Sequence, residues 1–334
     1  MKICIYGAGA IGGYIGTRLA LRGRHEISAV ARGATLAALQ QHGWRVRSGG
    51  QLLQAPATAS AEPAQLGVQD LVVIAVKGPA LAAVAAGITP LLGPDTLVLP
   101  AMNGVPWWFG AGSEALGPAP LESVDPGGRI AAAIALKHVI GCVVHISSAT
   151  SEPGLVEHSK AQGLIVGEAG GGESARVGQL AEVLTDAGFD TTVSASIRRD
   201  IWYKLWGNLT MNPVSAITGA TADRVLDDPL VRSFCTRAMR EAGEIGARIG
   251  CAIEQQPEDR HVITRKLGAF KTSMLQDVEA GRALELDAIV GVVQEMGQRL
   301  GVATPNIDAL LGLARLFGRV HGLYPEATPA APTA

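Results

Sequence analysis

The sequence predicts an α/β protein in which a doubly wound parallel sheet is followed by an all-helical C-terminal part. Near-continuous apolar runs, typical of buried parallel strands, occur at residues 70–78 and 96–104. The chain has 42 glycines but only 4 % aromatic residues, which favours a sheet with many tight turns over a helical bundle. Beyond residue 196 the apolar pattern is helical throughout. With 334 residues, the chain is long enough for two cores.

Composition limits the partners and the compartment. The 28 basic and 30 acidic residues leave a formal charge of −2, which provides no basic surface for nucleic acid. No stretch approaches the length of a membrane span, and no signal pattern follows Met1. We therefore expect a cytoplasmic protein with no nucleic-acid or membrane partner. The cysteines lack metal or redox spacing, which indicates reduced thiols and no metal site: Cys4, Cys142, Cys235 and Cys251.

A glycine-rich turn follows the first predicted strand, residues 2–6, and leads into a helical run. In this G-x-G-x-x-G pattern, Gly7 suits the turn, Gly9 lets the backbone approach a pyrophosphate, and Gly12 lets helix and strand pack closely. Because the order strand, turn, helix is the one the motif requires, we expect a Rossmann-type dinucleotide-binding fold rather than an ordinary glycine-rich turn. The predicted cofactor-binding residues of the turn are Gly7, Ala8, Gly9, Ala10, Ile11 and Gly12.

The second predicted strand, residues 26–31, is followed by Arg32, and no acidic residue occurs from residue 29 to 41. Folds that bind NAD usually place a carboxylate here for the ribose 2′-hydroxyl, whereas a guanidinium suits a 2′-phosphate. We therefore predict NADP(H) as the cofactor. The alternative is that Arg32 is a solvated charge at the strand end.

The next two predicted strands, residues 70–78 and 96–104, carry Lys77 and Asn103 near their carboxyl ends. Ligands of open α/β sheets bind beyond the carboxyl ends of the strands. We therefore expect both side chains to reach the same crevice as Arg32 and the glycine turn. For Lys77 alone, a solvated surface lysine fits equally well.

The middle of the chain begins with a predicted loop, residues 105–128, that is rich in Gly and Pro. Its aromatic cluster is either a hydrophobic plug between domains or a wall of the substrate pocket. A β-hairpin over 138–168, a helix over 174–188 and a strand over 191–196 follow. The cluster consists of Trp107, Trp108 and Phe109.

The predicted domains are an NADP-binding domain over residues 1–196, a helical substrate and catalytic domain over 197–322, and a disordered tail over 323–334. The tail is rich in Pro, Ala and Thr, a composition that does not support a packed core.

A polar stripe distinguishes the helix predicted over residues 198–218. Lys204, Asn208 and Asn212 are four residues apart, so at about 100° per residue they fall within roughly 80° of one face. The rest of that helix is apolar, so the stripe faces a partner or a cavity. Two interpretations fit: a catalytic amine beside two orienting amides, or a lysine paired with a distant acid beside amides that bridge neighbouring helices.

Glu285 and Asp287 open a later predicted helix, after a helix over residues 271–277 that stops near Gly281. An acid in the first turn of a helix is expected from the helix dipole alone. Taken by itself, Glu285 is therefore more typical of a helix start than of a catalytic group.

Together these motifs resemble the ketopantoate reductase (2-dehydropantoate 2-reductase) family, in order and from Met1 to about residue 310. They are GAGAIG, Arg32, Val76-Lys77, Asn103-Gly104, K-x-x-x-N-x-x-x-N-P over residues 204–213, and SMLQD with E-x-D between residues 273 and 287. The resemblance implies a helical domain like the C-terminal domain of 6-phosphogluconate dehydrogenase. It also implies NADPH-dependent reduction of 2-dehydropantoate (ketopantoate) to (R)-pantoate, a step of pantothenate biosynthesis.

The resemblance also implies roles for individual residues. Lys204 is then the proton donor to the substrate carbonyl, and Glu285 holds the terminal hydroxyl of the substrate. The remaining implied contacts are Asn208 and Asn212 to the substrate, Ser273 to its carboxylate, and Asn103 to both nicotinamide and substrate.

Two departures from the family pattern concern the pocket: the aromatic cluster with the ESVDPGG that follows it, and Ala222 where some members carry a polar residue. One changed pocket contact shifts discrimination between substrates by about 1–3 kcal/mol. A related reductase of a bulkier 2-oxo acid is therefore an alternative. A non-catalytic NADPH sensor is a second alternative, and a homodimer is one open possibility for the assembly.

Overall fold

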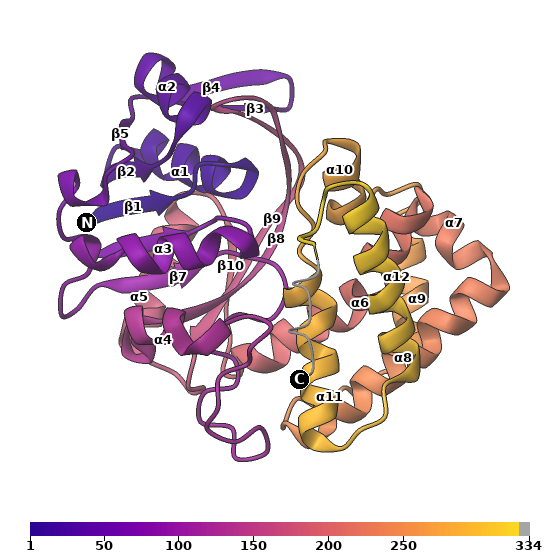
Figure 1. The fold of residues 1–334 in the computed structure, drawn as a ribbon. Coiled ribbons are helices and arrows are strands. Elements are labelled where there is room, and N and C mark those ends of the chain that lie inside the picture. The colour runs from indigo at the N-terminus through magenta and orange to yellow at the C-terminus, as the bar shows by residue number, and fades with distance from the viewer. Residues whose placement is uncertain (327–334) are drawn as a thin grey trace, which may run out of the picture. The chain divides into compact units, whose positions relative to one another are not determined.

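The computed structural model describes residues 1–326, which form two compact units (Figure 1). Unit 1 comprises Met1–Gly112 and Asp125–Ile201, and unit 2 comprises Ser113–Val124 and the chain from Trp202 onward. The segment Ser113–Val124, expected within the N-terminal domain, therefore groups with the helical unit. Among the described residues, no helix has the length and apolarity of a membrane span.

The first sheet of unit 1 is parallel throughout. Its strand order β5-β2-β1-β6-β7 reverses direction between β1 and β6, as expected for a doubly wound sheet. The strands are β1 (Lys2–Tyr6), β2 (Glu26–Val30), β5 (Thr58–Ser60), β6 (Leu71–Ile74) and β7 (Leu97–Pro100), and the helices nearby are α1 (Ala10–Arg22), α2 (Gly33–His42), α3 (Leu81–Gly87) and α4 (Arg129–Ala133).

Strands β6 and β7 are shorter than the apolar runs 70–78 and 96–104 that predicted them. After Ile74 the chain leaves the sheet, and a short 3-10 turn begins at Gly78. Strand β1, which pairs with β6 as far as Tyr6 and Ile74, ends at the same level, so β6 has no β1 partner beyond Ile74. The apolar residues beyond the strand ends thus form loops.

A second sheet completes unit 1, and α1 packs against strands of both sheets. The predicted hairpin over 138–168 is confirmed as the antiparallel pair β8 and β9. Gly16 of α1 leaves room for the buried Trp44 ring, since a Cβ there would lie 2.4 Å from Trp44 Cζ3. The elements are β3 (Trp44–Ser48), β4 (Gln51–Ala55), β8 (Ile140–Glu152), β9 (Leu155–Glu168), α5 (Ala175–Asp186) and β10 (Asp190–Val193).

Unit 2 is helical, as the periodicity predicts. Helix α6 (Ile197–Thr218) begins in unit 1 and continues through Pro213. The other elements are α7 (Ala222–Asp227), α8 (Pro229–Arg248), α9 (Pro257–Arg265), α10 (Ser273–Glu279), the π-helical turn η6 (Asp287–Gly291), α11 (Val292–Leu300) and α12 (Pro305–Val320).

Two side chains of α11 hold the segment Ser113–Val124. The Glu295 carboxylate accepts hydrogen bonds from the backbone N–H groups of Glu122 at 2.9 Å and Ser123 at 2.8 Å. Arg299 pairs with Glu295 at 2.5 Å and donates to backbone carbonyls earlier in the segment. These bonds join the segment to the helices of unit 2.

The tail predicted over residues 323–334 begins with packed residues. Leu323 is buried, and its N–H donates to the carbonyl of Gly318 at 2.7 Å. The Tyr324 hydroxyl donates to Asp287. Residues 327–334 lie outside the described residues.

Candidate functional site

The glycine turn in unit 1 has the geometry that the motif predicts. Gly7 has a φ of +98°, a conformation that favours glycine, and a Cβ there would lie 2.6 Å from Val76 Cγ1. A Cβ on Gly12 would lie 2.0 Å from the Gly7 carbonyl oxygen and 3.0 Å from Ile5 Cγ2. Both glycines are therefore required by the fold itself.

Gly9 differs, because no atom of the described protein explains it. It is exposed, its φ is −79°, and a Cβ would meet nothing within 4 Å. Gly9 is the N-cap of α1, whose first turn has neither a side-chain cap nor an acidic residue. Its N–H groups and positive dipole end thus suit an anion such as a pyrophosphate.

The other predicted cofactor contacts follow neighbouring parallel strands. Tyr6 pairs with Val30 in β1 and β2, and Ile74 pairs with Pro100 in β6 and β7. Because these strands are parallel, their carboxyl ends lie along one edge of the sheet. The residues that follow them at this edge are the glycine turn, Arg32, Lys77 and Asn103.

Arg32 is exposed at the N-cap of α2. Within residues 1–326 its guanidinium has no hydrogen bond or ion pair. Burial raises the pKa of the Tyr6 phenol at the end of β1, and the charge of Arg32 opposes that rise. A guanidinium in this position is available for an anionic ligand.

The aromatic cluster is part of the interior of unit 1. Trp107, Trp108 and Phe109 are each less than 5 % exposed. Trp108 and Ile197 fill the space above Gly141 of β8, where a Cβ would lie 2.9 Å from Trp108 Cη2. Packing therefore accounts for Trp108 without a ligand.

Helix α6 carries the polar stripe in unit 2. Lys204 and Asn208 are half-buried, and Asn212 is 4 % exposed. The helix is fixed by buried apolar neighbours and by a hydrogen bond of 2.7 Å from Trp206 Nε1 to the Met239 carbonyl of α8. No hydrogen bond to the Asn208 amide occurs within residues 1–326, so this half-buried group is available to a ligand.

Two predicted substrate contacts from different helices lie together. Asn212 Nδ2 donates to Ser273 Oγ at 3.5 Å, which joins α6 to the first turn of α10. Thr272 caps α10 through the N–H of Leu275 and fixes the start of that helix. Ala222, one of the departures from the family pattern, is buried in a cluster of apolar residues from α6, α7, α8 and α12.

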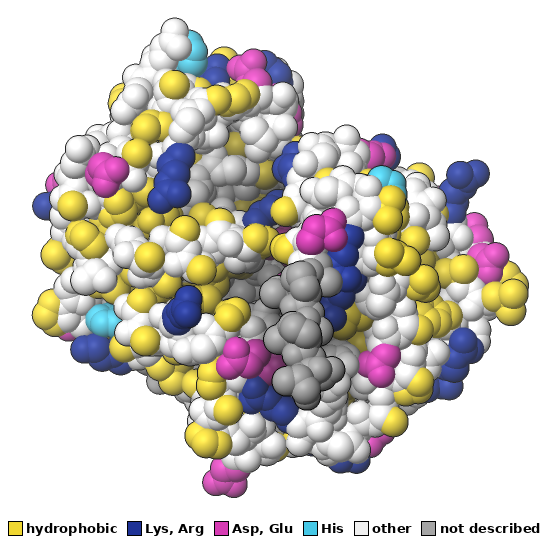
Figure 2. All heavy atoms as spheres, viewed as in Figure 1, with side chains coloured by type: hydrophobic (Ala, Val, Ile, Leu, Met, Phe, Trp, Pro, Cys, Tyr) yellow, Lys and Arg dark blue, Asp and Glu magenta, His cyan; other side chains and the backbone are white. Residues whose placement is uncertain are grey.

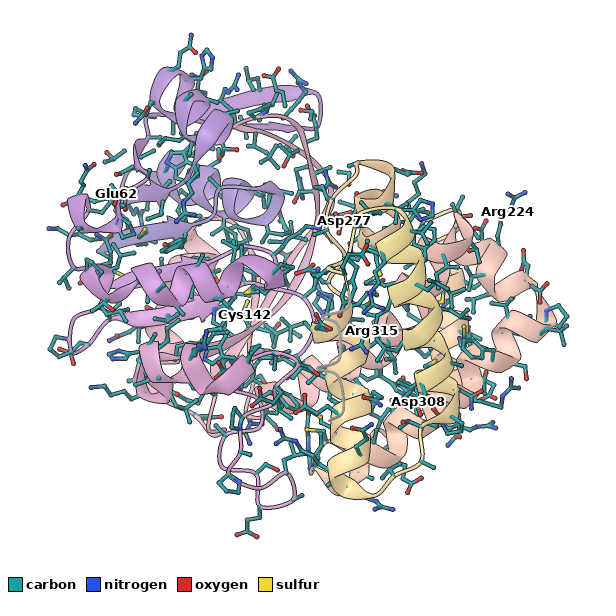
Figure 3. The ribbon with its side chains drawn as sticks, viewed as in Figure 1. Glu62, Cys142, Arg224, Asp277, Asp308 and Arg315 are labelled. Carbon is teal, nitrogen blue, oxygen red and sulfur yellow. The ribbon has the colours of Figure 1, made fainter. Side chains whose placement is uncertain are left out.

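Glu285 lies in the non-helical stretch immediately before α11 and its π-helical first turn. It is half-buried. Asp287 accepts a hydrogen bond from Tyr324 and lies 3.6 Å from Arg315 Nη2 on α12, which Figure 3 labels. Tyr324 is not among the predicted site residues, because it falls in the tail predicted over residues 323–334. Its one local mark in the sequence is a glycine at a helix end shortly before it.

The charged side chains on the face of the molecule in Figure 2 form no single-sign field. Basic and acidic side chains are interspersed over the face in Figure 2. On α10, Asp277 pairs with Arg282 at 3.0 Å. This face therefore carries no extended basic patch of the kind that attracts a polyanion.

Comparisons with known proteins agree with the motifs. The profile of a family described as "Ketopantoate reductase PanE/ApbA" matches residues 3–171, and that of "Ketopantoate reductase PanE/ApbA C terminal" matches residues 196–317. A protein of Mesorhizobium japonicum named 2-dehydropantoate 2-reductase is 43 % identical over 97 % of this chain and 100 % of its own length.

Solved structures share the fold. A crystal structure assigned to the ketopantoate reductases, from Ralstonia solanacearum MolK2, is 55 % identical, with a TM-score of 0.92 over 96 % of this chain and 99 % of that one. A D-mandelate dehydrogenase with NADH and anilino(oxo)acetate is 21 % identical, with a TM-score of 0.83 over 97 % of this chain and 100 % of that one. The second likeness concerns the fold alone.

Proposed function

Because the chain belongs to the ketopantoate reductase PanE/ApbA family, a family of nicotinamide-dependent oxidoreductases, we propose that it reduces 2-dehydropantoate to (R)-pantoate with NADPH, a step of pantothenate biosynthesis. The observation that carries this proposal is the stripe of Lys204, Asn208 and Asn212 on α6, with Ser273 within hydrogen-bond reach of Asn212. A protein that only bound the cofactor would need none of these groups.

Unit 1 supplies the groups proposed to bind NADPH. The pyrophosphate would lie against Gly9 and the N-terminus of α1, where a side chain is absent and N–H groups are available. Arg32 would bind the 2′-phosphate, and Lys77 and Asn103 would contribute from the ends of the neighbouring strands. When bound, NADPH supplies a hydride to the ketone carbon.

The preference for NADPH is tested with Arg32→Ala. Losing a charge-assisted bond costs about 1.5–3 kcal/mol, so KM for NADPH should rise about 10- to 100-fold. KM for NADH should change little, because NADH has no 2′-phosphate. An equal change for both cofactors would contradict the assignment of Arg32.

Lys204 is the proposed acid of the reaction. Its ammonium donates a hydrogen bond to the substrate carbonyl oxygen and then transfers a proton to the alkoxide that forms. Asn208 and Asn212 orient the substrate without adding charge, and Ser273 donates to its carboxylate. Glu285 accepts a hydrogen bond from the terminal hydroxyl.

The function is tested by following NADPH absorbance with purified protein and 2-dehydropantoate, beside 2-oxo acids that carry larger apolar groups. We expect efficient turnover of 2-dehydropantoate alone, since the aromatic cluster is packed in unit 1. Turnover only of the larger acids would indicate the alternative function, a related reductase of a bulkier 2-oxo acid. Tight NADPH binding without any turnover would instead support a sensor.

We also propose that the protein is a cytoplasmic homodimer. Helix α12 exposes Leu313 and Leu316, each 59 % exposed, and Val320, 73 % exposed. Their spacing places them on one face, and a second copy would remove this apolar surface from water. Light scattering after size-exclusion chromatography tests the assembly, with Leu316→Glu expected to shift it to the monomer.

A further inference from the structure

The segment of residues 323–325 contacts the chain on both sides of Glu285. The N–H of Leu284 donates to the Leu323 carbonyl at 2.9 Å. The Tyr324 hydroxyl donates to Asp287 Oδ1 at 2.6 Å. Leu323 and Tyr324 are consecutive. They therefore bind Leu284, the residue before Glu285, and Asp287, two positions after it.

This segment is itself fixed to α12. The Leu323 N–H donates to the Gly318 carbonyl at 2.7 Å, and Arg319 Nε donates to the Pro325 carbonyl at 3.1 Å. A Cβ on Gly318 would lie 2.6 Å from Tyr324 Cβ, so the tyrosine side chain packs directly on the helix at this glycine. The Arg319 guanidinium lies 5.7 Å from the Tyr324 ring centroid.

Glu285 needs such support because no helix fixes its backbone. Residues 282–285 are not helical, and the next element opens with a π-helical turn, Asp287–Gly291. Single π-helical turns are rare and often occur at functional sites. Asp287 also lies 3.6 Å from Arg315 Nη2, so its carboxylate is held between two groups anchored on or beside α12.

We propose that Tyr324, through Asp287, positions Glu285 for the terminal hydroxyl of the substrate. The inference rests on the proposed function, in which Glu285 accepts that hydroxyl. Tyr324 is a positioning residue and not a catalytic one, because it acts through the backbone of the turn. Its effect is therefore specific to substrates that carry the hydroxyl.

The test compares Tyr324→Phe with the unchanged protein on two substrates, 2-dehydropantoate and its analogue without the hydroxyl, 3,3-dimethyl-2-oxobutanoate. Removing one hydrogen bond to a carboxylate should lower kcat/KM for 2-dehydropantoate about tenfold. The value for the analogue should stay nearly constant, so the ratio of the two falls. An unchanged ratio would overturn the proposal.

Thr304→Val is the matched control, because it removes another hydroxyl-to-carboxylate bond of unit 2, to Asp308 at 2.9 Å. Valine keeps the shape of the buried threonine. A structural loss alone would lower the stability of both variants without changing the substrate ratio. Only Tyr324→Phe should change the ratio, and an equal change in Thr304→Val would contradict the proposal.

Hydrogen exchange separates this proposal from the proposed function. Amides of residues 284–291 should exchange faster in Tyr324→Phe but not in Thr304→Val. Unchanged exchange there would overturn the positioning role, whatever the substrate. Glu285→Ala tests the function itself, because alanine has no side-chain acceptor: if its substrate ratio is normal, Glu285 does not hold the hydroxyl. If its ratio falls, adding Tyr324→Phe should lower it little further.

Discussion

Gly9 and Gly12 belong to the same motif but carry different constraints. A Cβ added to Gly12 would overlap the Gly7 carbonyl oxygen, whereas a Cβ added to Gly9 would meet nothing within 4 Å. Gly12→Ala should destabilise the fold by about 1–3 kcal/mol or more, the usual cost of overpacking. Gly9→Ala should lose only about 1 kcal/mol, as an N-cap substitution, yet bind NADPH at least about tenfold more weakly.

Urea unfolding and fluorescence titration with NADPH measure both effects. We expect Gly12→Ala mainly to lose stability and Gly9→Ala mainly to lose NADPH affinity. Normal NADPH affinity in Gly9→Ala would remove the assignment of the pyrophosphate to this turn.

Lys204 is the residue on which the chemistry depends. Lys204→Ala should lower turnover about 100-fold or more, because acid catalysis contributes about 10²–10⁴-fold, and should leave NADPH affinity intact. Single-turnover kinetics and NADPH titration measure the two quantities. Lys266→Ala removes the same charge from an exposed position of unit 2 and should change neither. Normal turnover in Lys204→Ala would exclude it as the acid.

At the scale of elements, Glu168 at the end of β9 fixes the start of α5. Its carboxylate accepts hydrogen bonds from Arg176 Nε at 2.6 Å and from the capping hydroxyl of Ser174 at 2.6 Å. The bond from Arg176 is the main cause that lowers the pKa of Glu168 below its ordinary value of 4.5, with burial opposing it. The strand and helix are therefore joined by a pH-sensitive contact.

The lowered pKa determines the sign of the pH dependence. The unfolded state binds the proton more readily, so this contribution to stability is complete above 4.5 and is lost as the pH falls through the lower folded value. Glu168→Gln should be less stable near neutral pH and should show a smaller loss below about pH 4.5. Urea unfolding across this range measures the slope, and an unchanged acid slope would contradict the role.

At the scale of the whole molecule, all four cysteines are buried thiols. Burial raises the pKa of Cys4 and of Cys235 to about 11, so neither is a thiolate at neutral pH. The folded protein should react slowly with a thiol reagent such as DTNB, and the unfolded protein should release four equivalents. Fast reaction of the folded protein would show that the cores open readily.

Local patterns predicted much of this molecule because their causes are local. The glycine turn, the hairpin of β8 and β9, and the Ser174-capped α5 are each confirmed, since backbone conformation, alternation and capping act within a few residues. The strands predicted over residues 70–78 and 96–104 are longer than the observed strands β6 and β7. Apolar residues continue there because most of the loop residues that follow both strands are half-buried.

The sequence by itself determined the fold class, the family, and the helix face that carries Lys204, Asn208 and Asn212. The spacing and the composition of the residues are enough to predict these features, because both reflect which positions of a strand or helix are buried. Only the tertiary structure decided that Ser273 lies at Asn212, that Glu295 holds the segment Ser113–Val124, and that Tyr324 reaches Asp287. These pairs are far apart in the chain, and side-chain bonds of that kind leave no local pattern to detect.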